Sequence, residues 1–108
     1  MAELDEEGSA NVSIDVTPDQ DEIVVTVGGE LDISTAGVLE EAIFFDGRHD
    51  ARRMVFDLSD VDFMDSSGIA VLLRAAAPTG WVEIRRPSTV VRLVVEATGL
   101  ADVLRISE

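Results

Sequence analysis

The sequence contains no cysteine and no lysine, and each absence excludes whole classes of chemistry. Without a thiol, the chain can form no disulfide, no cysteine nucleophile and no cysteine-ligated metal site. Without lysine, it lacks the P-loop lysine, the amine of a Schiff base and the lysine used by receiver-type phosphorylation sites. The single histidine, His49, lies in a polar segment, and no Gly-x-Ser-x-Gly motif is present. Both facts argue against a serine hydrolase.

The sequence also lacks a long apolar run and a positively charged start. No run approaches the roughly 20 residues that a membrane-spanning helix needs. The first residues are acidic, whereas a signal peptide begins with positive charge. We therefore expect a cytoplasmic protein.

Positive charge is scarce, since 8 basic and 22 acidic residues give a formal net charge of −14. Such a surface repels duplex nucleic acid and anionic membranes, so we expect neither as a partner. Most of the acidic surplus lies in residues 1–50, which contain only one arginine. This surplus has two interpretations, a solubilising surface or an electrostatic guide toward a basic partner. Arg85-Arg86 is too small a basic patch for nucleic acid and is expected to pair with acids on neighbouring elements.

What is present fits one folded domain, because the chain has 108 residues of which 46% are hydrophobic. We expect residues 1–10 to form a flexible acidic tail and residues 11–108 to form the domain. Alternating or β-branched runs predict strands at 12–16, 23–27, 54–58, 81–84 and 103–106. A turn is expected at 17–21, and Gly28-Gly29 is expected to end the second strand or form a bulge.

Apolar residues at spacings of three and four predict helices that follow the second, third and fourth strands. The first is expected to be capped by Ser34 and to reach about Phe45. The second is expected at 66–77, stopped by Pro78, and the third between Pro87-Ser88 and Gly99. Strands that alternate with helices predict an α/β domain with parallel neighbours and right-handed crossovers. We expect a mixed sheet of four to five strands, with an antiparallel N-terminal hairpin and the helices packed on one face.

The turn Asp65-Ser66-Ser67-Gly68, which opens the second helix, is the most informative stretch. A helix N-terminus exposes unpaired N–H groups and partial positive charge, so it accepts an anion well. A phosphorylated serine there would add a charge of about −1.5 to −2 at pH 7. The competing interpretation is structural, because Asp and Ser are common helix caps. The pattern alone leaves both interpretations open.

The chain resembles a STAS domain, and more closely the bacterial anti-sigma factor antagonists, over about residues 12–106. Four stretches carry the resemblance: Gly29-Glu30-Leu31-Asp32, Ser34-Thr35-Ala36, residues 55–69 with Phe63-Met64-Asp65-Ser66-Ser67-Gly68-Ile69, and Glu96-Ala97-Thr98-Gly99-Leu100. The resemblance implies a phosphoacceptor at Ser66, with Ser67 as the alternative. It also implies that an anti-sigma factor, itself a serine kinase, binds the unphosphorylated form and releases its sigma factor. Phosphorylation ends this binding, and a serine phosphatase resets the cycle.

In this scheme the protein is a binding module, not an enzyme, and needs no cofactor. The resemblance implies a partner-binding surface made of Asp32, Asp65, Ser66, Ser67, Gly68 and Ile69. An alternative role is that of a STAS scaffold subunit in a stress-signalling or lipid-transport complex. A Mg²⁺ site is conceivable among Asp57, Asp60, Asp62 and Asp65, since hard cations prefer oxygen ligands. A solvated or capping role for these acids is favoured, and no metal is expected.

Overall fold

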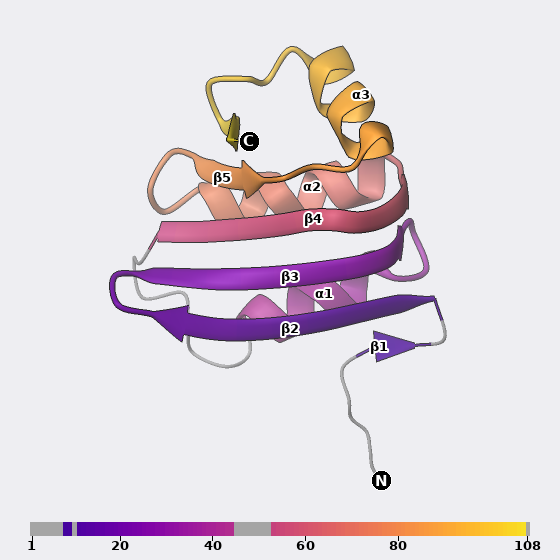
Figure 1. Cartoon of the computed structure of the whole chain (residues 1–108), viewed down its shortest axis with the longest axis horizontal. Helices are drawn as coiled ribbons and strands as arrows, with labels where there is room; N and C mark the ends of the chain where they lie inside the picture. The colour runs from indigo at the N-terminus through magenta and orange to yellow at the C-terminus, as the bar shows by residue number, and fades with distance from the viewer. Residues whose placement is uncertain (1–7, 10, 45–52, 108) are drawn as a thin grey trace, which may run out of the picture.

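The structure, a computed structural model, describes residues 8–9, 11–44 and 53–107. Within these residues the chain forms one six-stranded sheet, in the order β1-β2-β3-β4-β5-β6, and three helices. The strands are β1 (Gly8–Ser9), β2 (Val12–Asp19), β3 (Glu22–Leu31), β4 (Arg53–Met64), β5 (Val82–Arg85) and β6 (Leu104–Ser107). The helices are α1 (Ala36–Phe44), α2 (Ser66–Ala76) and α3 (Thr89–Thr98). Figure 1 shows their arrangement.

The sheet is mixed, as the sequence predicts. Strands β1, β2 and β3 pair antiparallel, whereas β3, β4, β5 and β6 pair parallel. The α/β class, the mixed sheet and the antiparallel hairpin are therefore confirmed. The sheet has one strand more than the expected four to five because Gly8 and Ser9 pair with the start of β2. The other residues of the predicted acidic tail, 1–7 and 10, lie outside the described residues.

The core lies between the sheet and its helices. Helices α1 and α2 cover one face, behind the strands in Figure 1, and α3 adds Val91 and Val95 to the same core cluster. Alternate residues of the central strands point into this core, including Val25 on β3 and Phe56 and Leu58 on β4, all fully buried. Burying a side chain of this size contributes about 1.5–3 kcal/mol. Helices α1 and α2 therefore pack on one face, as expected, whereas α3 follows β5 and contacts β4.

Strands β3 and β4 are longer than predicted. The sequence suggests that β3 ends at Gly28-Gly29 and that β4 ends at Leu58, but β3 continues to Leu31 and β4 to Met64. Parallel pairing between the two strands supplies the reason, because it extends to the pair Leu31–Met64 and satisfies the backbone of both. The register shifts twice around Gly28 and Gly29, so these glycines form an irregular, bulged stretch within β3.

The first turn is also tighter than predicted. Strand β2 runs on to Asp19, so the chain reverses over Gln20 and Asp21, with Gln20 at φ 59°. Pro18 lies inside β2, beyond the two residues that pair with β1. Its missing N–H therefore falls on a free edge of the sheet, where a proline is tolerated.

The predicted ends of α3 agree with the structure, and the predicted end of α2 differs from it by one residue. Helix α3 is capped by Ser88, whose hydroxyl accepts from the N–H of Val91, and it ends at Gly99 in the left-handed conformation. Helix α2 stops at Ala76, one residue before the predicted end. None of the helices in the described ranges is long and apolar enough to cross a membrane.

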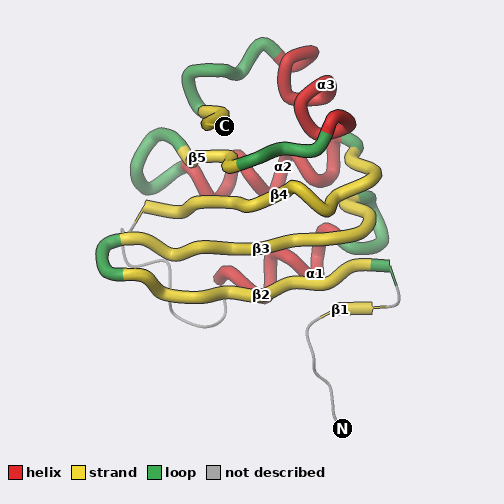
Figure 2. The backbone as a smooth tube through the Cα atoms, viewed as in Figure 1, coloured by secondary structure: helices red, strands yellow, loops and turns green. Residues whose placement is uncertain are grey.

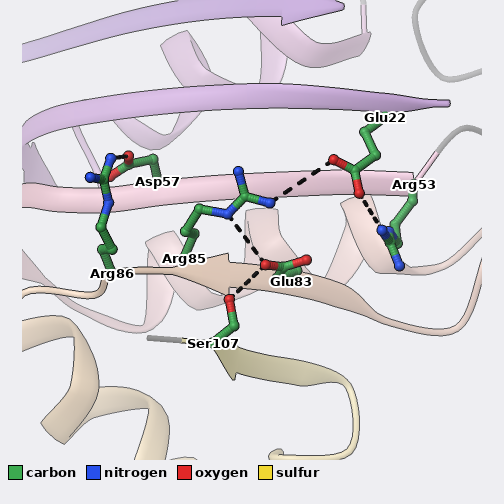
Figure 3. A network of polar contacts seen from close by, with 7 residues as sticks. All are labelled: Glu22, Arg53, Asp57, Glu83, Arg85, Arg86 and Ser107. Carbon is green, nitrogen blue, oxygen red and sulfur yellow. Dashed lines mark hydrogen bonds and ion pairs between the residues drawn. The ribbon is translucent and has the colours of Figure 1, made fainter. Parts of the chain in front are cut away.

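The sheet face turned away from α1 and α2 carries a network of ion pairs (Figure 3). Arg53 pairs with Glu22, Arg86 pairs with Asp57, and Arg85 lies 3.3 Å from Glu83 and 4.0 Å from Glu22. This confirms that Arg85 and Arg86 form ion pairs with acids on other strands of the sheet. Three of the seven arginines in residues 51–108 are thereby paired with acids of the domain.

Candidate functional site at the start of helix α2

The predicted site lies where the carboxyl ends of β3 and β4 meet. The loop from β3 to α1 and the turn from β4 to α2 come together at the same edge of the sheet, on the right in Figures 1 and 2. The backbone N–H of Asp65 donates to the carbonyl of Leu31 at 3.2 Å and joins the two segments. The structure therefore brings Asp32 and the Asp65-Ser66 turn, which are 33 positions apart in sequence, to one edge.

Asp65 is the cap of α2. It has an extended backbone (φ −125°, ψ −167°), and its carboxylate accepts from the N–H of Ser67 at 2.8 Å. Its carbonyl accepts from Gly68 and Ile69, at 3.1 and 3.3 Å, which closes the first turn. A carboxylate here also stabilises the positive end of the helix dipole. The capping role that the sequence leaves open for the serines thus belongs to the aspartate before them.

The two serines differ in exposure. Ser66, the first residue of α2, is exposed, whereas Ser67 is half-buried. Within the described residues the hydroxyl of Ser66 makes no side-chain hydrogen bond, so it has no role in holding the turn. The sequence-based preference for Ser66 over Ser67 stays a prediction, and the greater exposure of Ser66 supports it.

Gly68 and Ile69 face inward. Gly68 is buried, and a Cβ there would lie 3.1 Å from Leu31 Cβ and Met64 Cγ and 3.3 Å from the Leu31 carbonyl oxygen. Ile69 is 7% exposed and belongs to the core cluster. The glycine therefore lets α2 lie directly against β3 and β4. Of the predicted partner-binding residues, these two are placed to hold the turn rather than to offer contact area.

Asp32 holds the loop that leads into α1. Its Oδ1 accepts from the N–H and the hydroxyl of Ser34, at 2.9 and 2.7 Å, and from the N–H of Thr35 at 3.2 Å. The hydrogen bond from the Ser34 hydroxyl is the largest cause that lowers the pKa of Asp32 below its ordinary value. Asp32 therefore holds the turn that precedes α1, and Ser34, the predicted cap, is a donor to this carboxylate.

Thr35 also holds this loop, through hydrogen bonds to the backbone of Glu30 and Asp32. It is 1% exposed, its hydroxyl donates to the Glu30 carbonyl at 2.6 Å, and it accepts from the Asp32 N–H at 3.0 Å. A buried hydroxyl with both donor and acceptor satisfied gives the loop one conformation. Hydrogen bonds therefore hold both the loop before α1 and the turn that carries Ser66.

Sequence reasoning missed two exposed apolar residues at this edge. Ile33, in the loop between β3 and α1, is 83% exposed, and Phe63, near the end of β4, is 46% exposed. Ile33 stands between two polar residues outside any periodic run. That isolation is the only signal in the sequence, since its exposure depends on how the loop packs.

Two of the four acids considered for a cation have separate partners. Asp57, on β4, accepts from Ser59 and pairs with Arg86, while Asp65 caps α2. Among the described residues, no three His, Asp or Glu side chains converge on a point where a metal ion would fit. His49 lies outside the described residues.

Comparison with known proteins identifies the class to which this fold and turn belong. The STAS domain family model matches residues 11–108, so the chain is a member of the STAS domain family. The resemblance noted from the sequence is thereby confirmed over nearly the whole chain.

Relatives within this family have regulatory names. The chain is 29% identical over 101 residues to the anti-sigma-B factor antagonist of Bacillus subtilis, covering 90% of this chain and 92% of that protein. It is 33% identical over 70 residues to the anti-sigma-F factor antagonist RsfB of Mycobacterium tuberculosis, covering 65% of this chain and 57% of that protein. A crystal structure of an anti-sigma factor antagonist from Mycobacterium paratuberculosis superposes with a TM-score of 0.77 at 27% identity, covering 94% and 89% of the two chains. The unphosphorylated form of SpoIIAA shares the fold, with a TM-score of 0.69 at 22% identity, over 89% of each chain.

Proposed function

We propose that this protein is an anti-sigma factor antagonist whose binding is switched off by phosphorylation of Ser66. In its unphosphorylated form it binds an anti-sigma factor that is a serine kinase, and the sigma factor is released. The kinase transfers a phosphoryl group from ATP to Ser66, a serine phosphatase removes it, and the protein acts in the cytoplasm as a binding module without catalysis of its own. The observation that carries the proposal is an exposed hydroxyl at the start of α2 that has no hydrogen bond to the described part of the chain, in a protein whose relatives are anti-sigma factor antagonists.

The structure supports a modification that leaves the fold intact. Because Asp65 caps α2, the hydroxyl of Ser66 is not needed for the turn. The phosphate would stand at the positive end of an 11-residue helix, where backbone N–H groups and the dipole favour an anion. We therefore expect phosphorylation to leave the domain as stable as before and to change only its surface.

The same charge would oppose binding. A phosphate dianion in the middle of a contact must either lose its water or hold the two proteins apart, and both cost free energy. Asp32 and Asp65 already make this edge acidic, which adds like-charge repulsion when the dianion arrives. A phosphorylated form that stays folded but no longer binds the anti-sigma factor is the behaviour expected of a switch.

Phosphorylation assays test the site directly. The protein is incubated with ATP and, separately, each purified anti-sigma factor serine kinase of the source organism, and the products are weighed by intact-mass spectrometry. We expect one phosphate on the wild type and on Ser67→Ala, and none on Ser66→Ala. Ser67→Ala is the matched control, because it removes the adjacent hydroxyl of the same turn. Full phosphorylation of Ser66→Ala would refute the assignment.

A binding assay tests the consequence. Ser66→Ala is expected to bind the kinase like the unphosphorylated wild type, because alanine adds no charge. Ser66→Asp is expected to bind more weakly, though less so than the phosphoprotein, since one carboxylate carries less charge than a phosphate. Equal affinity of Ser66→Asp and the phosphoprotein with the wild type would contradict the switch.

A further inference from the structure

Among the described residues few large apolar side chains are exposed, and two of them lie in the segments that end β3 and β4, close in sequence to the turn that carries Ser66. Over the described residues the exposed large hydrophobic side chains are Ile33, Phe63 and Leu93. Leu93 lies on α3, whereas Ile33 and Phe63 lie at the edge formed by the ends of β3 and β4. A pair of exposed apolar side chains rimmed by polar ones is typical of a binding surface.

One hydrogen bond ties these two residues to the candidate phosphorylation site. The bond joins the Asp65 N–H to the Leu31 carbonyl. Phe63 stands two residues before Asp65, Ile33 stands two residues after Leu31, and Ser66 follows Asp65 directly. Strand pairing fixes the same arrangement, since Glu30 opposes Phe63 and Leu31 opposes Met64.

The loop that carries Ile33 is held in one conformation although its side chain is in water. The flanking Asp32 carboxylate accepts hydrogen bonds from Ser34 and Thr35, and Thr35 is anchored to Glu30. Little ordering remains to be done when a partner arrives, so a contact at Ile33 costs little conformational entropy. An apolar residue on a rigid, exposed loop is well suited to anchor an interface.

Charge around the pair indicates the chemistry of the partner. Acids flank both residues along the chain: Asp32 precedes Ile33, Asp62 precedes Phe63, and Glu30 pairs with Phe63 across the strands. Hydrogen bonds lower the pKa of Asp32, led by the one from Ser34, so that carboxylate is ionised at neutral pH. A complementary surface has an apolar socket bordered by Lys or Arg. A second copy of this chain fits poorly, because its net charge is −14 and self-pairing would place acid against acid.

We propose that Ile33 and Phe63 are the apolar anchors of the anti-sigma factor interface, and that a phosphate on Ser66 acts by keeping them hydrated. This inference rests on the proposed function and assigns contact residues to it. Burial of the two anchors brings the Ser66 hydroxyl into a dry contact, which a neutral hydroxyl tolerates and a dianion does not. Lys or Arg residues on the anti-sigma factor pair with the acids of this protein. Burial of Ile33 and Phe63 is the part of the contact that phosphorylation disrupts.

Three alanine variants of exposed side chains test the anchors. Ile33→Ala and Phe63→Ala are compared with Leu93→Ala, the matched control on α3, for affinity to the purified anti-sigma factor serine kinase that binds the wild type. We expect each anchor variant to raise Kd by roughly 10- to 100-fold and the control by less than about twofold. Circular dichroism melting is expected to show an unchanged Tm for Ile33→Ala and Leu93→Ala, and a cooperative transition at a somewhat lower Tm for Phe63→Ala, because Phe63 is only 46% exposed.

A second measurement links the anchors to the switch. Phosphorylation of Ser66 is expected to raise Kd by a smaller factor in the Ile33→Ala/Phe63→Ala double variant than in the wild type, because the anchors are already lost. Equal factors in both backgrounds, or anchor variants that bind like the wild type, would overturn the inference alone. If no anti-sigma factor serine kinase binds the wild type, the proposed function fails and the inference fails with it. If sedimentation shows a dimer that Ile33→Ala dissolves, the surface pairs with a second copy and the assigned partner is wrong.

Discussion

Replacing Asp65 separates the two tasks that the structure gives this residue, capping α2 and charging the edge beside Ser66. Its carboxylate accepts from the Ser67 N–H at 2.8 Å and stands at the positive end of the helix. Loss of an N-cap side chain costs about 1 kcal/mol, within a range of about 0.5–2. Loss of a favourable charge at a helix N-terminus costs about 0.3–1 kcal/mol more. We expect Asp65→Ala to lower the free energy of unfolding by about 1–2 kcal/mol.

Asp65→Asn keeps the cap and removes the charge. Asparagine caps helices about as well as aspartate, so this variant should lose only the dipole contribution of about 0.3–1 kcal/mol. Asp62→Ala is the control, since Asp62 is exposed on β4 and makes no side-chain hydrogen bond within the described residues. That variant is expected to stay within about 0.5 kcal/mol of the wild type.

Urea unfolding followed by circular dichroism measures these differences at constant m value. The predicted order of stability is wild type and Asp62→Ala highest, Asp65→Asn next, and Asp65→Ala lowest. A Tm decrease of roughly 4 °C or more is expected for Asp65→Ala, given the size of the domain. If Asp65→Ala matched Asp62→Ala, or if Asp65→Asn were as unstable as Asp65→Ala, the assignment of Asp65 as the cap would be wrong.

Three further changes have expected outcomes, each measured by urea unfolding. Gly68→Ala gains about 1 kcal/mol of helix propensity but overpacks a buried contact, a cost of about 1–3 kcal/mol, so net destabilisation is expected. Gly29→Ala should lower the free energy of unfolding by more than about 2 kcal/mol, because the φ of Gly29 is +95° and a Cβ would collide with a backbone carbonyl. Gly37→Ala is the control, since Gly37 lies in open space on α1, and it should raise the free energy of unfolding by up to about 1 kcal/mol. Desolvation raises the pKa of Asp57, but hydrogen bonds from Arg86 and Ser59 outweigh it and leave this pKa below its ordinary value. Because the pKa of Asp57 is lower in the folded than in the unfolded state, its carboxylate stabilises the fold at pH values above the unfolded-state pKa. This stabilisation is lost as the pH falls through the folded-state pKa. Asp57→Asn should therefore show a shallower loss of stability below about pH 4 than the wild type.

Elements defined by local signals were predictable from the sequence. Helix α3 is marked by Ser88 at its start and Gly99 at its end, and these outweigh its β-branched interior. The hairpin β2–β3 is marked by alternation and by the polar residues of its turn. In each case a few neighbouring residues determine the conformation, so the pattern predicts it without reference to the rest of the fold.

Features that depend on distant partners were not predictable. The second half of β4 is rich in Asp and Ser, which favour a loop, yet it forms a strand because β3 lies beside it and pairs as far as Met64. Strand β1 exists only through its two pairs with β2. The role of Asp32 in the turn before α1 was missed because Ser34, a good cap by residue type, is instead a donor to that aspartate.

The candidate site divides along the same line. The position of Ser66 at a helix start follows from the local pattern Asp-Ser-Ser-Gly, and the structure adds that the residue is exposed. The inward direction of Gly68 and Ile69 and the exposure of Ile33 and Phe63 depend on packing between β3, β4 and α2. The candidate contact residues could therefore be identified only from the structure, because the sequence does not show which side chains are exposed.

The most direct measurement is isothermal titration of the kinase with two forms of this protein that differ only in the phosphate on Ser66. We predict that the unphosphorylated form binds and that phosphorylation raises Kd by about 100-fold or more, with Tm unchanged. Equal Kd values for the two forms would contradict the account, because the added dianion would then lie outside the contact.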